Sequence, residues 1–174
     1  MTQRNYTAEI TEFGNHYGYD VSYMHEILKS SPDGYQKFSD FIPLASHKDH
    51  LDLETHWIVR LTTLQFADCG TCLELGIKMA LEDNVSKELI KATLQGGKSL
   101  TKDQLNLYLY TRAIAACEQV SPDLQIIING QFNSAQLLEI GILIGATKVF
   151  PAIKRASGHI VSCSLITNTL DDLL

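Results

Sequence analysis

The chain has 174 residues, of which 45% are hydrophobic and 20% charged, and its formal net charge is −6. This length suits one domain, or two small halves that share a core. An acidic chain without a basic cluster is a poor candidate for binding nucleic acid or an anionic membrane. Residues 1–20 contain no apolar signal core, and the most apolar run, 137–146, is about half the roughly 20 residues of a membrane span. We therefore expect a cytoplasmic protein.

Helix signals dominate along the chain. Leu53, Trp57, Leu61 and Leu64 recur at helical spacing, and several Ser, Thr and Asn residues stand where N-caps are expected. The predicted helices span, in chain order, residues 21–29, 32–42, 51–66, 69–81, 87–95, 102–119, 122–129 and 134–156. The strand candidates are residues 125–128 and 160–166, without an alternating pattern at regular spacing. We predict an all-α fold.

Three regions are predicted along the chain. They are an N-terminal helical extension over residues 1–50, a helical core over 51–158 and a C-terminal tail over 159–174. Residues 45–50 are polar and are expected to form the loop before the core.

The last predicted helix carries three unusual features. Pro151 should kink or split it. Glu139 lies within an apolar run and needs a partner, which we expect to be a Lys or Arg across an interface. Gly141 and Gly145 allow another helix to approach closely. Together these features predict a homo-oligomer.

Cys69 and Cys72 form a CxxC pair. Residues three apart on a helix are neighbours, and their Cα atoms then lie at a distance that suits a disulfide. If Asp68 caps this helix, Cys69 falls in its first turn, where unpaired N–H groups and the helix dipole favour a thiolate. The negative charge of Asp68 acts in the opposite direction. We predict a redox-active dithiol.

Two alternatives to a redox role stay open. A structural disulfide across so short a loop would stabilise the fold by only about 2 kcal/mol. A zinc site would need further ligands, and His47 and His50 are candidates, although HxxH before a single CxxC does not match the usual order of structural zinc sites. The remaining cysteines, Cys117 and Cys163, are expected to be buried as small hydrophobic residues.

Two residues of the helix before the CxxC are candidate proton carriers. Glu54 falls beside Leu61 on a helical wheel, and therefore on the apolar face, where desolvation would favour its protonated form. The alternative is a solvent-facing carboxylate in the first helical turn. His56 falls on the polar face with Arg60 and Thr63, where a solvated histidine is expected. Our hypothesis is that Glu54 helps to ionise one cysteine, either directly or through water or His56.

The order of these elements resembles the alkylhydroperoxidase D and carboxymuconolactone decarboxylase family. Residues 53–94, an amphipathic helix followed by CxxC and a serine-capped helix, look like the family's core. Residues 134–158 are similar to its C-terminal helix, so that the likeness covers about 52–158. The family pattern has a histidine four residues after the second cysteine, where this chain has Gly76, and a glutamate twelve residues before the first, where it has Trp57.

The resemblance implies an oligomeric alkylhydroperoxidase D-like fold and a peroxidase-like activity, because decarboxylase members generally lack the cysteine pair. Cys69 and Cys72 would reduce a hydroperoxide or another disulfide, without cofactor or metal, and Glu54 and His56 would serve the proton path. A dithiol or thioredoxin-like reductant would restore the pair. The family also implies a homotrimer or homohexamer. The alternative is a non-catalytic helical assembly or redox sensor that retains the dithiol.

Overall fold

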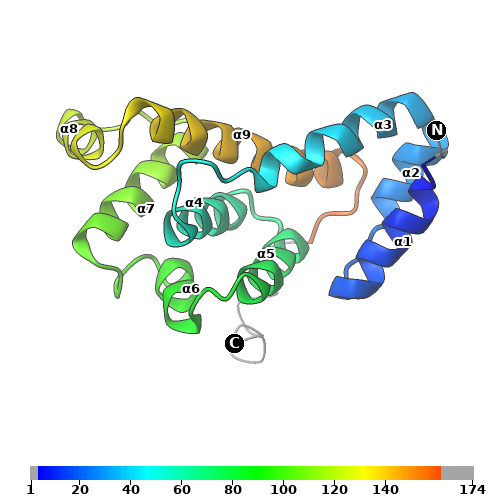
Figure 1. The fold of residues 1–174 in the computed structure, drawn as a ribbon, viewed down its shortest axis with the longest axis horizontal. Coiled ribbons are helices and arrows are strands. Elements are labelled where there is room, and N and C mark those ends of the chain that lie inside the picture. Colours follow the sequence, from blue (N-terminus) through cyan, green and yellow to red (C-terminus); the bar gives the residue numbers. More distant parts are fainter. Residues whose placement is uncertain (1–3, 162–174) are drawn as a thin grey trace.

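The structure, a computed structural model, describes residues 4–161. Every regular secondary-structure element in this part of the chain is a helix, which confirms the predicted all-α class (Figure 1). It contains, in order, α1 (Tyr6–Tyr17), α2 (Ser22–Ser30), α3 (Pro32–Phe41), the short 3-10 helix η1 (Ile42–Ser46), α4 (Leu53–Phe66), α5 (Gly70–Glu82), α6 (Lys87–Leu94), α7 (Lys102–Ala115), α8 (Pro122–Gln131) and α9 (Ser134–Ala156).

Side-chain caps fix most of the predicted helix starts. The Oγ of Ser86 accepts a hydrogen bond from the Leu89 N–H and begins α6. Thr101 and Asn133 each form a capping box with the glutamine three residues on, and begin α7 and α9. Because these side chains satisfy N–H groups that have no partner inside the helix, local sequence was sufficient to locate these boundaries.

The structure differs from the expected elements at three places. Helix α1 was not predicted, although Asn5 caps it and Gly18 ends it in the left-handed conformation. Residues 125–128, a strand candidate, lie within α8. Helix α9 continues through Pro151, so the helix is not split there.

Helix α4 is the centre of the fold. All residues from position 55 to position 64 are buried, because α5 and α6 cover one side of the helix and α7 and α9 cover the other. A helix that is buried all round must be covered by several elements. The residues of α4 therefore contact both halves of the structure, and the dithiol follows directly at its C-terminal end.

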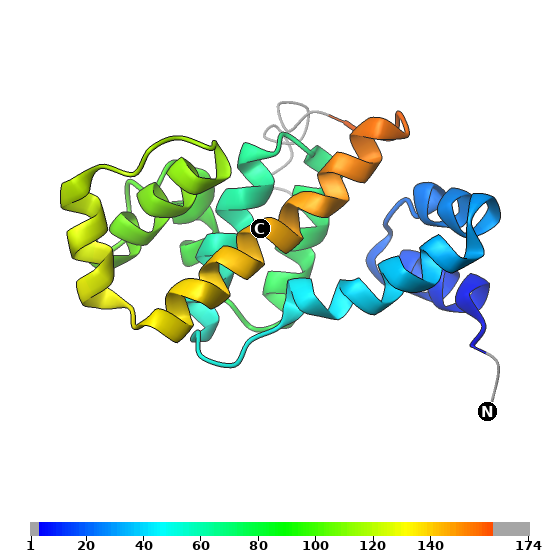
Figure 2. The same ribbon diagram turned by 90° about the horizontal axis from the view of Figure 1, so that it is seen from above.

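Helices α1, α2 and α3 form a separate aromatic cluster around Ile10, Tyr23 and Phe38. They stand beside the end of α9, which contributes Phe150 and Ile153 to this cluster (Figure 2). The division into an extension, a core and a tail stays a prediction, and most of the predicted tail, with Cys163, lies outside the described residues.

Helix α9 is the one described helix that is long and apolar enough, by length and composition alone, to cross a membrane. Its inner stripe holds Glu139, Thr147 and Lys154, all buried against the rest of the protein. Its outer stripe exposes Leu138 and Ile142.

Candidate functional site

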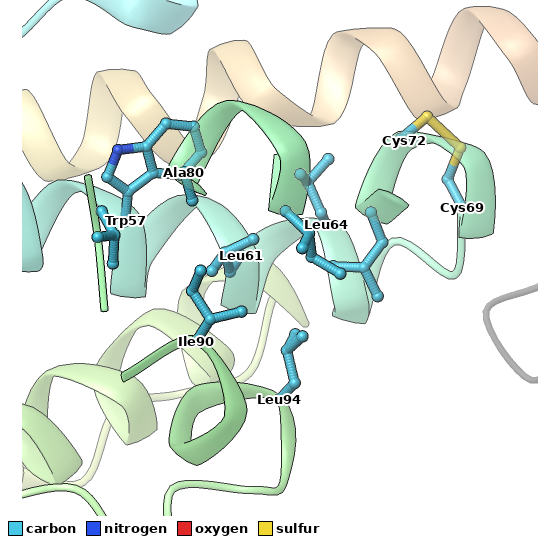
Figure 3. Close-up of a cluster of buried hydrophobic side chains, with 11 residues drawn as sticks. Trp57, Leu61, Leu64, Cys69, Cys72, Ala80, Ile90 and Leu94 are labelled. Atoms are coloured by element: carbon cyan, nitrogen blue, oxygen red, sulfur yellow. A yellow bond between two sulfur atoms is a disulfide. The ribbon is translucent and has the colours of Figure 1, made fainter. Parts of the chain in front are cut away.

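The CxxC pair forms a disulfide at the start of α5. The Cα atoms of Cys69 and Cys72 are 5.3 Å apart, and the pair lies at one end of the cluster formed by α4, α5 and α6, with Trp57 at the other end (Figure 3). Cys69 is 0% and Cys72 4% exposed. The predicted pairing is present, but both sulfurs are shielded.

The predicted cap of this helix was wrong. Asp68 has φ 47°, and Cys69 itself is the N-cap residue, without a side-chain cap hydrogen bond. The short connection from α4 to α5 requires a residue in the left-handed region, which aspartate tolerates better than most residues. Asp68 therefore makes the turn, and the predicted first-turn position belongs to Cys72.

Cys72 lines a cavity of about 250 Å³ between α1–α3 and the α4–α5–α9 core. The cavity volume lies just below the roughly 300–1,000 Å³ that is usual for small-molecule sites. Its wall is mainly apolar and aromatic, with Ile10, Phe13, Tyr23, Leu64, Leu75 and Phe150 among the lining residues. A substrate bound in this cavity would meet Cys72 and not Cys69.

A short polar chain runs along the other side of the disulfide. The Lys154 Nζ donates to the Thr71 Oγ1 at 2.9 Å, and the Thr71 Oγ1 lies 3.9 Å from the Cys69 Sγ. Since the lysine donates to the hydroxyl oxygen, the hydroxyl hydrogen is free to point at the sulfur. This arrangement favours a thiolate on Cys69 when the disulfide opens.

Lys154 is 0% exposed and has an unusual setting. Its Nζ also donates to the Tyr19 hydroxyl at 3.2 Å and lies 4.5 Å from the centre of the Tyr19 ring. Burial lowers the pKa of Lys154, and the nearby Asp20 carboxylate partly offsets this effect. Among residues 4–161, Lys154 makes no ion pair with a carboxylate, so its charge acts mainly on Thr71 and the aromatic rings.

Sequence reasoning missed Lys154, although a signal was available. In α9 the buried positions Leu143, Thr147 and Pro151 recur at helical spacing, and Lys154 continues the same stripe. A lysine on a buried stripe is expected to have a specific partner. The identity of that partner, Thr71, depends on the tertiary structure and was not available from periodicity.

Arg60 is a second buried cation, 8% exposed, and lines the same cavity as Cys72. The Nη1 donates to the Ala45 carbonyl at 3.0 Å, and the guanidinium stacks on the Trp57 ring with 5.2 Å from Cζ to the ring centre. Burial lowers the pKa of Arg60 to about 10. Arg60 was expected on a solvated polar face; that face is in fact covered by η1.

Of the two positions expected for Glu54, the structure shows the solvent-facing carboxylate in the first helical turn and not the buried apolar face. Glu54 is exposed, and one of its carboxylate oxygens accepts a hydrogen bond from the Gln104 Nε2 at 2.9 Å. Because α4 is buried on every side, a helical-wheel projection of α4 has no separate apolar face. The exposure of a side chain depends instead on how far along the helix axis it lies. Glu54 lies in the first turn, roughly 18 Å from the C-terminal end that precedes the dithiol.

His56 was expected to be solvated and is instead 1% exposed. Burial, followed by the charges of Arg60 and Lys48, lowers the pKa of His56 to about 4, so the ring is neutral at pH 7. His56 packs edge-on against Trp57, and Trp57 lies at the end of the cluster away from the disulfide (Figure 3). The structure does not bring Glu54 or His56 together with the sulfurs.

Close packing accounts for the residue at the family's histidine position. A Cβ at Gly76 would lie 2.6 Å from the Leu64 Cδ1, so the absence of a side chain lets α5 approach α4. At the family's glutamate position, Trp57 is buried and its Nε1 donates to the Asp83 carboxylate at 2.9 Å. Neither position supplies a titrating group beside the sulfurs.

The remaining candidates also lie away from the dithiol. His47 and His50 precede α4, whereas the cysteines follow it, and within the described residues no three His, Cys, Asp or Glu side chains gather as metal ligands do. Cys117 was expected to be buried but is exposed, in the turn that follows α7.

Within the described chain, the partners of Glu139 are backbone N–H groups and not a Lys or Arg. Its carboxylate accepts hydrogen bonds from the backbone N–H groups of Asp49, His50 and Leu51. Burial alone would raise the pKa of Glu139, but these donors outweigh it and leave the pKa below its ordinary value. Glu139 thus holds the loop before α4 against α9.

Comparison of the chain with protein-family models, with curated proteins and with solved structures finds no match in any of the three. The fold and the site together describe an all-helical protein with a shielded dithiol on the wall of an apolar cavity.

Proposed function

We propose that this chain is a dithiol oxidoreductase that reduces a hydroperoxide, or a small disulfide, bound in the cavity beside Cys72. One observation carries the proposal. The disulfide has one sulfur on the wall of an apolar cavity and the other beside the Thr71–Lys154 chain. These two environments suit an attacked sulfur and a departing thiolate.

With a hydroperoxide, the Cys72 thiolate attacks the terminal oxygen. The S–O bond forms while the O–O bond breaks, and the alkoxide takes up a proton and leaves as an alcohol. The Cys69 thiolate then attacks the sulfur of the sulfenic acid, the S–S bond forms, and hydroxide takes up a proton and leaves as water. The dithiol thereby supplies two electrons and two protons.

An external dithiol restores the reduced pair. One of its thiolates attacks the Cys72 sulfur from the cavity, and Cys69 departs as a thiolate stabilised by Thr71 and Lys154. The second thiol of the reductant then attacks the mixed disulfide and releases Cys72. Run in reverse, the same exchange reduces a disulfide substrate. The resemblance to the alkylhydroperoxidase D family supports this chemistry, with a proton path other than the family's histidine.

The test begins with the reduced protein, which is mixed with hydrogen peroxide or an organic hydroperoxide, quenched by alkylation and mapped by peptide mass spectrometry. We expect a Cys69–Cys72 disulfide and one alcohol per disulfide formed. In Cys69→Ser, Cys72 should accumulate as a sulfenic acid that dimedone traps. In Cys72→Ser, oxidation should be at least about tenfold slower. Cys117→Ser is the matched control and should behave like the wild type.

Two results would contradict the proposal. Equal oxidation rates in Cys69→Ser and Cys72→Ser would remove the distinction between the two sulfurs. A disulfide that forms once but does not turn over with excess dithiothreitol would favour the alternative of a redox sensor that retains the dithiol.

A further inference from the structure

The cavity beside Cys72 has a cationic end. On α5, Cys72, Gly76 and Met79 all line it, and the Arg60 Nη2 lies 3.9 Å from the Met79 Sδ. Cys72 and Met79 are seven residues apart on one helix, which corresponds to roughly 10 Å along its axis. The cavity therefore joins a sulfur at one end to a guanidinium at the other.

The guanidinium has spare hydrogen-bonding capacity. Its Nε is buried and has no partner among residues 4–161, and its Nη2 meets only a thioether sulfur, a weak acceptor. No ion pair joins Arg60 to a carboxylate in the described chain, since Asp83, the nearest acidic influence on its pKa, binds Lys48 and Trp57 instead. A buried cation in this state normally has a counter-ion.

A second unpartnered group lines the same cavity. Thr147 is 1% exposed, and its Oγ1 has no hydrogen-bond partner within the described residues. Buried hydroxyls and guanidinium nitrogens are nearly always hydrogen-bonded in native proteins. Two such groups lining one cavity indicate a ligand with an oxygen-bearing head, while the apolar lining around Leu64 and Phe150 indicates an aliphatic or aromatic body.

We propose that the cavity binds an amphipathic carboxylate of medium length, with its carboxylate on Arg60 and its apolar body extending toward Cys72. The binding of a carboxylate does not depend on the proposed function. One consequence does rest on it, namely that the preferred oxidant carries a carboxylate at one end and a hydroperoxide toward the other. The anionic head neutralises Arg60, and the distance along α5 selects the chain length.

Trp57 gives a direct measure of binding that does not depend on the dithiol. It is the single tryptophan of the chain, and Arg60 stacks on its ring. Octanoate, which cannot react with thiols and is comparable in extended length to the cavity, should change the Trp57 fluorescence saturably. Octanol, which has the same body without the charge, should bind roughly tenfold to a hundredfold more weakly, because a hydrogen bond to a charged group is lost.

Variants separate the charge from the shape. Arg60→Met should lose the preference for octanoate over octanol, whereas Arg112→Met, an exposed arginine outside the cavity, should keep it. Helical circular dichroism checks the folding of each variant. If Arg60→Met does not fold, the comparison of octanoate and octanol binding to the wild type still tests the proposal. Equal affinity of the wild type for octanoate and octanol, or no saturable binding of octanoate, would overturn the proposal.

The final arm uses an aliphatic hydroperoxide acid and its methyl ester as oxidants. The wild type should form the disulfide at least about tenfold faster with the acid than with the ester, and Arg60→Met should treat the two alike. If octanoate binds but neither compound oxidises the dithiol, the proposed function fails and the binding site stands. If both compounds oxidise the dithiol equally and octanoate does not bind, the proposed function stands and the binding site fails.

Discussion

Two buried cations, Lys154 and Arg60, lie in the surroundings of the two cysteines. Lys154 reaches the Cys69 side through Thr71, and Arg60 lines the cavity that Cys72 faces. Neither cation forms an ion pair with a carboxylate in the described part of the chain, so each retains much of its field in a medium of low dielectric.

Replacing Lys154 should weaken the activation of Cys69. In a Cys72→Ser background, Lys154→Met keeps most of the side-chain length but removes the charge and the donor to Thr71. The fraction of Cys69 present as thiolate should fall, and alkylation at neutral pH should slow about tenfold. Stopped-flow alkylation from pH 6 to pH 10 measures this effect. The rates of the two proteins should converge at high pH, and equal rates at neutral pH would contradict the role of Lys154.

His56 predicts a specific loss of stability in mild acid. Its folded pKa is about 4, below the ordinary value of about 6.5, so the unfolded chain binds more protons between these two pH values. The contribution of His56 to the free energy of unfolding is therefore fully present above about pH 6.5. It is lost as the pH falls toward 4, and the total loss is roughly 3 kcal/mol.

Urea unfolding at pH 7 and pH 5 tests this contribution. The wild type should lose more stability than His56→Gln between the two values, because groups common to both proteins cancel in the difference. An identical pH dependence in the two proteins would show that His56 already titrates normally in the folded state.

Among the elements, the contact between α4 and α5 controls the position of the dithiol. A Cβ at Gly76 would lie 2.6 Å from the Leu64 Cδ1, and α5 begins directly after Cys69 and carries Cys72 in its first turn. The approach of these two helices therefore fixes the wall of the cavity as well as the core.

Gly76→Ala should be less stable than Gly145→Ala, because alanine favours the helix at both positions but meets another side chain only at position 76. The Cβ at Gly76 would displace Leu64, at a cost of about 1–2 kcal/mol, whereas Gly145 has nothing within 4 Å of its Cβ position. In the isolated chain, alanine at position 145 should therefore stabilise α9 by roughly 0.5–1 kcal/mol. Thermal unfolding of both variants gives the comparison. A Gly76→Ala protein as stable as Gly145→Ala would mean that α5 does not pack this closely.

The sequence predicted the elements better than the site, for physical reasons. Caps such as Ser86, Thr101 and Asn133 are local, and so they located helix starts. The same local reasoning placed Glu54 on a buried face and His56 on a solvated one, because a helical-wheel projection assumes that one face of the helix is exposed to solvent. Helix α4 has no such face between positions 55 and 64. The burial of His56 and Arg60 depends on η1, α5 and α9, which only the tertiary fold brings together.

For the whole molecule, the outer surface of α8 and α9 is the main apolar region. Ile126 is 70% and Leu138 69% exposed, and Ile127 and Ile142 lie in the same two helices. Apolar side chains on adjacent helices are typical of interfaces between subunits. The predicted homotrimer or homohexamer would use this surface.

Light scattering at micromolar concentration should therefore give a mass several times the 19.4 kDa of the chain. The double variant Ile126→Glu, Leu138→Glu should lower the mass toward that of a monomer and keep the helical circular dichroism, since both side chains point away from the core. A monomeric wild type would contradict the predicted assembly.

The shielding of the two sulfurs has a kinetic consequence. A small dithiol can diffuse into the cavity and reach Cys72, and its rate should grow in proportion to its concentration. A thioredoxin-sized reductant is too large to enter while α1–α3 form one wall, so it must wait until these helices move aside. Its rate should then level off at the opening rate of the wall. The N-terminal helices would thus discriminate between reductants by size. Small dithiols would reach Cys72 without any movement of α1–α3, whereas a protein reductant would reach it only as fast as these helices move aside.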